Sequence, residues 1–161
     1  LEDPDSHGYQ LHARKKQKKS RGEITLNSSD PYDYPKILFN YLKEEEDLKQ
    51  TRECIHVARK ILSQPALSEH AGDEVGPGFN AQSDDELNEY IRSKADTAYH
   101  PCGTCKMGVD DMAVVDQDLK VNGIGNLRVI DASVIPEIPS ANLNAPTLMI
   151  AEKGSEAILN N

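Results

Sequence analysis

The sequence lacks a long apolar run. Its longest, APTLMIA at residues 145–151, is far shorter than the roughly 20 residues that a helix needs to cross a bilayer. We therefore expect no transmembrane segment in this chain.

Positive charge is also scarce. The 161 residues include 18 Lys and Arg against 27 Asp and Glu, a net charge of −9. Such a chain repels a phosphate backbone, so we expect no nucleic-acid partner. The one basic run, RKKQKKSR at residues 14–21, is interpreted as an exposed connection between two strands.

Cysteine is sparse, with three residues in the chain. An odd number without the dense spacing of a secreted scaffold predicts reduced thiols in an intracellular protein, either cytoplasmic or peripherally associated with a membrane. The chain starts at Leu1 and no signal-peptide pattern follows, so we expect N-terminal targeting information to be missing from it.

The segment AYHPCGTCKMG, residues 98–108, nevertheless places Cys102 and Cys105 in a C-x-x-C spacing. Structural zinc needs about four ligands, and no other Cys or His pair has ligand spacing. A redox dithiol needs a helix after the motif, which Gly108 would stop, and haem attachment needs a histidine where Lys106 stands. We therefore expect no metal site and interpret both cysteines as small residues whose packing holds the loop's shape.

Apolar alternation predicts strands. Residues 7–13 and 22–28 are predicted as half-buried strands joined by the basic run, and residues 28–37 as a turn-rich segment. Further on, 97–112 is predicted to be irregular, 113–116 and 119–121 to be short strands, and 127–131 a buried strand.

Helical periodicity predicts a long helix over residues 44–63. Its expected buried stripe consists of Leu48, Ile55, Ala58 and Leu62, widened by Val57 and Ile61.

Two further helices are predicted from their N-terminal signals. Ser83 and Glu86 have the spacing of a capping box, which opens a helix over 84–96. Asn144 is predicted to be the N-cap of a C-terminal helix with Ala145 and Pro146 in its first turn.

His100 is the histidine best placed for chemistry. Pro101 follows it and restricts its backbone to extended or turn conformations, so the imidazole would be presented from a stiff loop. From the residues alone, a structural role and a proton-transfer role both stay open.

Three segments read together resemble one enzyme family. They are SRGEITLNSSDPYDYPKILFNYL at 20–42, YHPCGTCKMG at 99–108, and AVVDQDLKVNGIGNLRVIDASVIPEIPSANLNAPTLMIAEK at 113–153. Their order and content resemble the C-terminal part of a glucose-methanol-choline (GMC) flavin oxidoreductase, from about His7 to Ile158, with most similarity to the choline-oxidising members.

The resemblance implies an α+β fold. Residues 1–96 would form a portion of the substrate domain, with a mostly antiparallel sheet and flanking helices. Residues 97–161 would form the catalytic loop, a return strand and a C-terminal helix that pack on an FAD domain.

The resemblance also implies site residues. His100 matches the histidine that takes the alcohol's proton or holds the alkoxide, and Asn142 matches its partner on the same oxygen and also contacts the cofactor. Asn144 matches a position near the flavin pyrimidine, and Asp131 and Ala132 match the segment that approaches the ribityl and pyrophosphate groups. The implied FAD contacts continue through Ala145, Pro146 and Thr147.

No G-x-G-x-x-G follows a strand in this sequence, so the nucleotide-binding half is expected to lie outside it. The implied activity is FAD-dependent oxidation of a primary alcohol, with choline to betaine aldehyde expected, by a longer enzyme whose C-terminal portion this chain forms. Aromatic residues make up only 5% of the chain and there is no tryptophan, so a cage for the trimethylammonium group is not visible. Three points stay open: another alcohol as substrate, oxygen or a quinone-like molecule as electron acceptor, and a non-catalytic interaction module without flavin.

Overall fold

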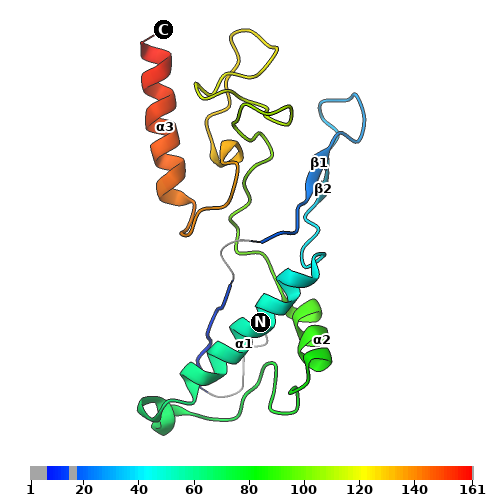
Figure 1. The fold of residues 1–161 in the computed structure, drawn as a ribbon, viewed down its shortest axis with the longest axis vertical. Coiled ribbons are helices and arrows are strands. Elements are labelled where there is room, and N and C mark those ends of the chain that lie inside the picture. Colours follow the sequence, from blue (N-terminus) through cyan, green and yellow to red (C-terminus); the bar gives the residue numbers. More distant parts are fainter. Residues whose placement is uncertain (1–6, 15–17, 161) are drawn as a thin grey trace. The chain divides into compact units, whose positions relative to one another are not determined.

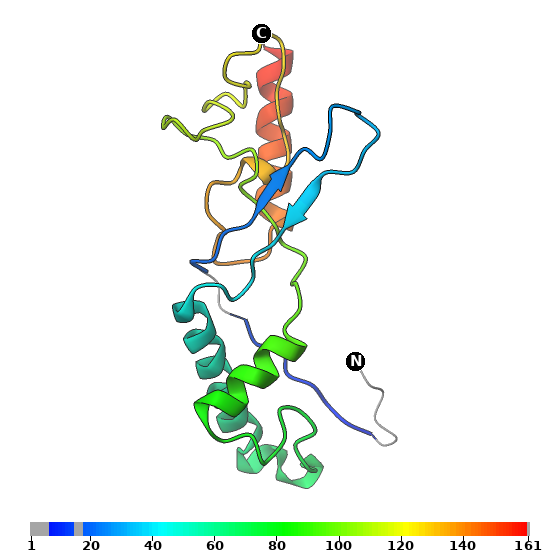
Figure 2. The same cartoon turned by 90° about the vertical axis from the view of Figure 1, so that its right-hand side faces the viewer.

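The computed structural model describes residues 7–14 and 18–160 (Figures 1 and 2). In chain order the elements are β1 (Glu23–Thr25), β2 (Lys36–Leu38), α1 (Glu45–Leu62), the 3-10 helix η1 (Pro65–His70), α2 (Asp84–Lys94), the 3-10 helix η2 (Ala132–Val134) and α3 (Asn144–Leu159). This combination of helices with a small antiparallel sheet confirms the α+β class.

The described chain divides into two compact units. Unit 1 contains the described residues up to Arg21 together with Asn40–Asp96, and unit 2 contains Gly22–Phe39 together with the described residues from Thr97 onward. The functional division expected at residues 96 and 97 concerns packing on an FAD domain and stays a prediction. None of the described helices is long and apolar enough to cross a bilayer.

The sheet is a hairpin of two short strands. β1 and β2 pair antiparallel, with Glu23 opposite Leu38 and Thr25 opposite Lys36. Its closing loop contains Asp30, whose carboxylate accepts the N–H of Tyr32 at 2.9 Å. A Cβ on Gly22 would lie 2.1 Å from the Leu38 carbonyl oxygen, so only glycine fits at the open end of the hairpin, directly before β1.

The predicted partner of residues 22–28 is wrong. Residues 7–13 form no strand, and β1 pairs instead with β2, whose first two residues belong to the segment predicted to be turn-rich. The basic run therefore does not connect two strands, and its residues 15–17 lie outside the described part of the chain. The predicted half-burial of 22–28 is also wrong, because Ile24 is 50% and Leu26 86% exposed. Alternation alone cannot identify a strand's partner, since pairing depends on residues distant in sequence.

α1 and α2 form the core of unit 1. Leu42, Leu48 and Ile91 are buried together, and Ile55 packs against them. Arg52 on α1 joins the helices, because its guanidinium contacts the Asn88 side-chain oxygen at 2.6 Å and Asp84 at 3.1 Å.

The long helix is confirmed to within one residue at each end, but its predicted stripe is too wide. Val57 is 55% and Ile61 46% exposed. They line a shallow groove beside residues 11–14, together with Cys54 and Ala58 on α1.

The capping box at α2 is confirmed. The Ser83 hydroxyl accepts the Glu86 N–H at 3.3 Å, and the Glu86 carboxylate accepts the Ser83 N–H at 2.8 Å. Hydrogen bonds from the Ser83 N–H and hydroxyl, and from the Gln82 N–H, lower the pKa of Glu86. The helix ends at Lys94, two residues before the predicted end.

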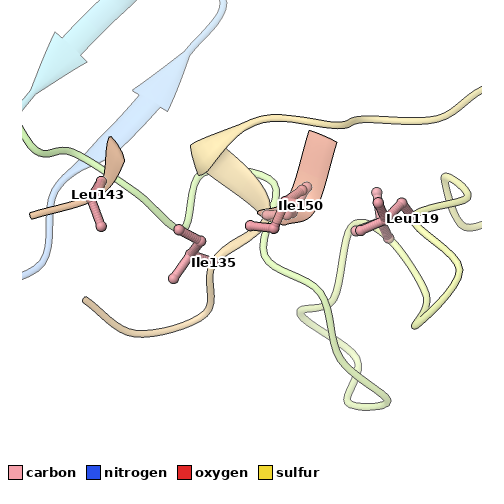
Figure 3. Close-up of a cluster of buried hydrophobic side chains, with 6 residues drawn as sticks. Leu119, Ile135, Leu143 and Ile150 are labelled. Atoms are coloured by element: carbon pink, nitrogen blue, oxygen red, sulfur yellow. The ribbon is translucent and has the colours of Figure 1, made fainter. Parts of the chain in front are cut away.

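Unit 2 is built around a core supplied mostly by loops. The buried side chains are Val115, Leu119, Val134, Ile135, Leu143 and Ile150. Figure 3 labels four of them, and they come from a loop, the residue after η2, the residue before α3, and α3 itself.

The strands predicted at 113–116, 119–121 and 127–131 are wrong. This region holds only single bridges: Met107 with Val115, Val115 with Val121, and Lys120 with Arg128. The Asp116 carboxylate accepts the N–H groups of Asp118 and Lys120, each at 2.9 Å, and so bends the chain after a few residues. Frequent turns leave each apolar run too short to pair as a strand.

α3 lies alongside this loop region in both ribbon views (Figures 1 and 2). Gly154 is buried at the contact, where a Cβ would lie 2.5 Å from Cγ2 and 2.8 Å from Cδ1 of Ile130. The Arg128 guanidinium also donates to the Ala157 carbonyl at 3.5 Å and to the Asp118 carbonyl. A glycine in mid-helix therefore allows α3 to approach residues 128–130 closely.

Replacing Gly154 with alanine is expected to destabilise unit 2. Alanine favours helix by about 1 kcal/mol over glycine, but the added methyl overpacks the contact with Ile130, so we expect a net loss of about 1–2 kcal/mol. Urea unfolding followed by circular dichroism measures the loss, with Ser155→Ala on the exposed side of α3 as control. A G154A protein as stable as S155A would contradict the close packing.

Candidate active site

The loop that carries His100 has a constrained backbone. Tyr99 adopts a positive φ of 58°, which is uncommon for a residue with a side chain. Its N–H donates to the Thr97 hydroxyl oxygen at 3.0 Å. Pro101 restricts His100 from the other side, and His100 itself is half-buried.

The same loop is tied to η2 by backbone hydrogen bonds. The Cys105 N–H donates to the Ser133 carbonyl at 3.0 Å and the Met107 N–H to the Val134 carbonyl at 2.8 Å. Gly103 has a φ of 89°, and a Cβ there would lie 3.4 Å from the Ile135 carbonyl oxygen. The catalytic-loop candidate therefore runs against the residues that follow Asp131.

The cysteines have no partner cysteine. Cys54, Cys102 and Cys105 form no disulfide, and all three are half-buried. Cys102 packs against the core of unit 2. Among residues 7–14 and 18–160, no group of three or more His, Cys, Asp or Glu is arranged to hold a metal. Packing by Cys102 stabilises the loop two residues from His100.

Asp131 begins η2 rather than ending a buried strand. One oxygen of its carboxylate accepts the Ser133 N–H at 2.7 Å and the Ser133 hydroxyl at 2.5 Å. The side chain thus orders the turn from within the chain, while Ala132, half-buried, packs against the core. Contact with a cofactor from this segment is best supplied by backbone groups and by the small Ala132 side chain.

The start of α3 differs from the prediction in its cap. Leu143 is the N-cap residue, with helical φ and ψ of −77° and −10°, and Asn144 is the first helical residue. The predicted N-cap role of Asn144 is therefore wrong. The Leu143 carbonyl accepts both the Thr147 N–H at 2.9 Å and the Thr147 hydroxyl at 2.7 Å. The helix starts here because Leu143 is buried in the core. Its apolar side chain cannot accept a hydrogen bond from the first turn, so α3 has no side-chain cap.

This helix start is suited to an anionic group. The N–H groups of Asn144 and Ala145 precede the first intrahelical bond, which Thr147 makes, and Pro146 has no N–H. The first turn carries no acidic side chain that would neutralise the positive end of the helix dipole. Asn144 is exposed, and its side chain does not cap the helix. These donors fit the part of a reduced flavin that carries negative charge.

Asn142 and His100 are positioned by the same core. Asn142 is exposed and directly precedes buried Leu143, while His100 stands two residues before Cys102. Leu143 belongs to the cluster against which Cys102 packs. Two candidate catalytic residues far apart in sequence are thus attached to one set of buried side chains.

Sequence reasoning missed two residues of this site. Tyr99 is 77% exposed beside His100, and Thr97 holds its backbone. A positive φ at tyrosine has no sequence signature, but the T-x-Y spacing is compatible with a side-chain turn and could have been noticed.

Known proteins support the assignment of a family. A family profile described as GMC oxidoreductase matches residues 18–151. The chain is 51% identical over 152 residues to the oxygen-dependent choline dehydrogenase of Klebsiella pneumoniae subsp. pneumoniae, covering 94% of this chain and 27% of that protein. The protein of the same name from Cronobacter sakazakii is 48% identical over 154 residues, covering 96% and 28%.

Solved structures agree. Pyridoxine 4-oxidase from Mesorbium loti superposes with a TM-score of 0.82 at 29% identity, over 91% of this chain and 28% of that one. An Aspergillus oryzae formate oxidase studied for FAD modification gives 0.81 at 34% identity, over 87% and 25%. The chain thus spans about 27% of the length of the curated relatives. It belongs to the GMC oxidoreductase family and carries that family's C-terminal domain.

Proposed function

We propose that this chain forms the catalytic C-terminal portion of an FAD-dependent enzyme that oxidises a primary alcohol, choline, to its aldehyde, betaine aldehyde. The observation that carries the proposal is that one core holds the neighbours of both candidate residues. Cys102, two residues after His100, packs against the core of unit 2, and Leu143, directly after Asn142, is part of that core. FAD, when bound, supplies the hydride acceptor.

His100 is proposed to take the proton of the substrate hydroxyl. An alcohol is a poor hydride donor and its alkoxide a good one, so a base at this oxygen lowers the barrier. An imidazole on a loop held by Pro101 and by the η2 hydrogen bonds is presented in a narrow range of positions.

Asn142 is proposed to donate a hydrogen bond from its amide to the same oxygen. An amide cannot act as a base, so it stabilises the developing negative charge while His100 holds the proton. Asn142 is exposed, so its side chain can reach a ligand, and the buried Leu143 beside it holds the backbone in place.

The first turn of α3 is proposed to hold the anionic edge of the flavin. The Asn144 and Ala145 N–H groups would supply donors, and Asn142, Pro146 and Thr147 would complete the contact surface. The residues Asp131 and Ala132 would lie against the ribityl and pyrophosphate groups, Ala132 through its small side chain. The donors described at these positions support this proposal.

Choline is proposed because two relatives of about 50% identity carry choline dehydrogenase in their names. The exposed Tyr99 ring beside His100 offers an aromatic face of the kind that binds quaternary ammonium groups. The longer enzyme of this proposal supplies the rest of the cage and the nucleotide-binding half. Its electron acceptor is oxygen or a quinone-like molecule, and its location is cytoplasmic or peripheral to a membrane.

A chimera tests the proposal. This chain replaces the matching C-terminal segment of the Klebsiella pneumoniae protein, and the purified chimera is expected to contain FAD and to reduce it when choline is added anaerobically. Absorbance of the flavin follows the reduction. Oxygen uptake against reduction of an added quinone then identifies the acceptor.

The control is this chain expressed alone, which is expected to hold no FAD. A chimera that folds without flavin would favour the non-catalytic interaction module. One that binds FAD and is reduced by another primary alcohol, while choline has no effect, would contradict the substrate and retain the reaction.

A further inference from the structure

We propose that Thr97 is a positioning residue for His100, acting through the backbone of Tyr99. The inference rests on the proposed function, since it assigns a role in presenting the proposed base. Thr97 touches no reacting atom in this scheme, and its hydroxyl oxygen accepts the Tyr99 N–H in the turn that precedes His100.

The backbone of Tyr99 is strained. A φ of 58° places it in the left-handed region, which is unfavourable for a residue with a side chain. Packing of the Tyr99 side chain does not offset this strain, because the side chain is 77% exposed. A local interaction must therefore hold the conformation.

The hydrogen bond from the Tyr99 N–H to the Thr97 hydroxyl, at 3.0 Å, is such an interaction. It is a side-chain turn over two residues, and Ser or Thr makes such turns. Without an acceptor at residue 97, Tyr99 is expected to relax to negative φ.

The consequence falls on His100. A change at Tyr99 rotates the peptide that leads into His100, while Pro101 and the bonds of Cys105 and Met107 to η2 hold the chain on the other side. The rotation is therefore absorbed at His100 rather than spread along the loop. Misplacing a catalytic group in this way slows the chemical step.

The test uses the full-length chimera with four variants: Thr97→Val, Thr97→Ser, the double variant Thr97→Val with Tyr99→Gly, and the single variant Tyr99→Gly. Thr25→Val, on the exposed hairpin, is the matched control. The measurements are FAD content, the anaerobic rate of flavin reduction at saturating choline, KM, and the φ of Tyr99 in a crystal structure of the T97V chimera.

The T97V rate per bound FAD is expected to fall about tenfold, with KM changed less than threefold and Tyr99 at negative φ, as follows from losing one hydrogen bond. T97S and T25V are expected to retain the parent rate. Since glycine adopts positive φ without cost, adding T97V to Y99G is expected to change the rate less than twofold.

Three outcomes overturn the inference: a T97V rate equal to that of T25V, a loss of FAD content with an unchanged rate per flavin, or the same tenfold loss in the Y99G background. Each of these leaves the proposed function intact if His100→Ala still abolishes rapid reduction. If H100A is reduced at the parent rate, the proposed function itself fails.

Discussion

Replacing His100 with alanine in the chimera is expected to slow flavin reduction by choline by about 10²- to 10⁴-fold. The variant removes the proposed base and leaves Asn142, which cannot take a proton. FAD content is expected to be unchanged, because the proposed flavin contacts lie at Asp131–Ala132 and at the start of α3. Anaerobic stopped-flow absorbance measures the rate at saturating choline, so that weakened substrate binding does not enter.

The matched control is His56→Ala. His56 is exposed on α1 in unit 1, so its replacement is expected to leave the rate unchanged. One further result separates a base from a structural histidine: added imidazole should restore part of the H100A rate. An H100A chimera that choline reduces at the parent rate would rule out His100 as the base.

Helices were predictable here because their signals are local. The stripe on α1 and the Ser83–Glu86 box each need only residues within one or two turns. Strand pairing was not, because β1 finds its partner across a loop and residues 113–131 make isolated bridges whose geometry depends on turns. The exposure of Val57 and Ile61 also depends on which other residues cover α1, and the sequence of the helix alone does not determine this.

The candidate site divides in the same way. His100 could be selected because the proline beside it is visible in the sequence. The cap of α3 could not be assigned correctly, because burial of Leu143 decides where the helix begins and Asn144 has the better capping side chain. Thr97 and Tyr99 could be recognised as part of the site only from the structure, because the positive φ of Tyr99 accompanies a hydrogen bond to the Thr97 hydroxyl that the sequence does not show.

The second large effect is expected at a buried carboxylate in unit 1. Asp47, in the first turn of α1, is 1% exposed. Its two oxygens accept the Lys19 N–H at 2.8 Å and the Ser20 N–H at 2.7 Å. One side chain therefore holds the segment before β1 against the helix, and its negative charge also faces the positive end of the helix dipole.

Replacing Asp47 with alanine is expected to lower the free energy of unfolding by about 3 kcal/mol, because two backbone donors lose a charged acceptor and a buried space is left. Urea unfolding of the chain, followed by circular dichroism, measures the total. Amide hydrogen exchange at Lys19 and Ser20 gives a local measurement, and both amides are expected to lose protection.

Glu45→Ala is the matched control, since Glu45 is acidic, lies in the same first turn and is exposed. It removes the same charge from the helix start, so the difference between the two variants reports the hydrogen bonds to residues 19 and 20 together with the buried space that D47A leaves. If D47A were no less stable than E45A, or if the two amides kept their protection, the carboxylate would not be what holds this segment. A D47N protein falling between the two would show that one amide oxygen replaces part of the acceptor pair and that the charge supplies the rest.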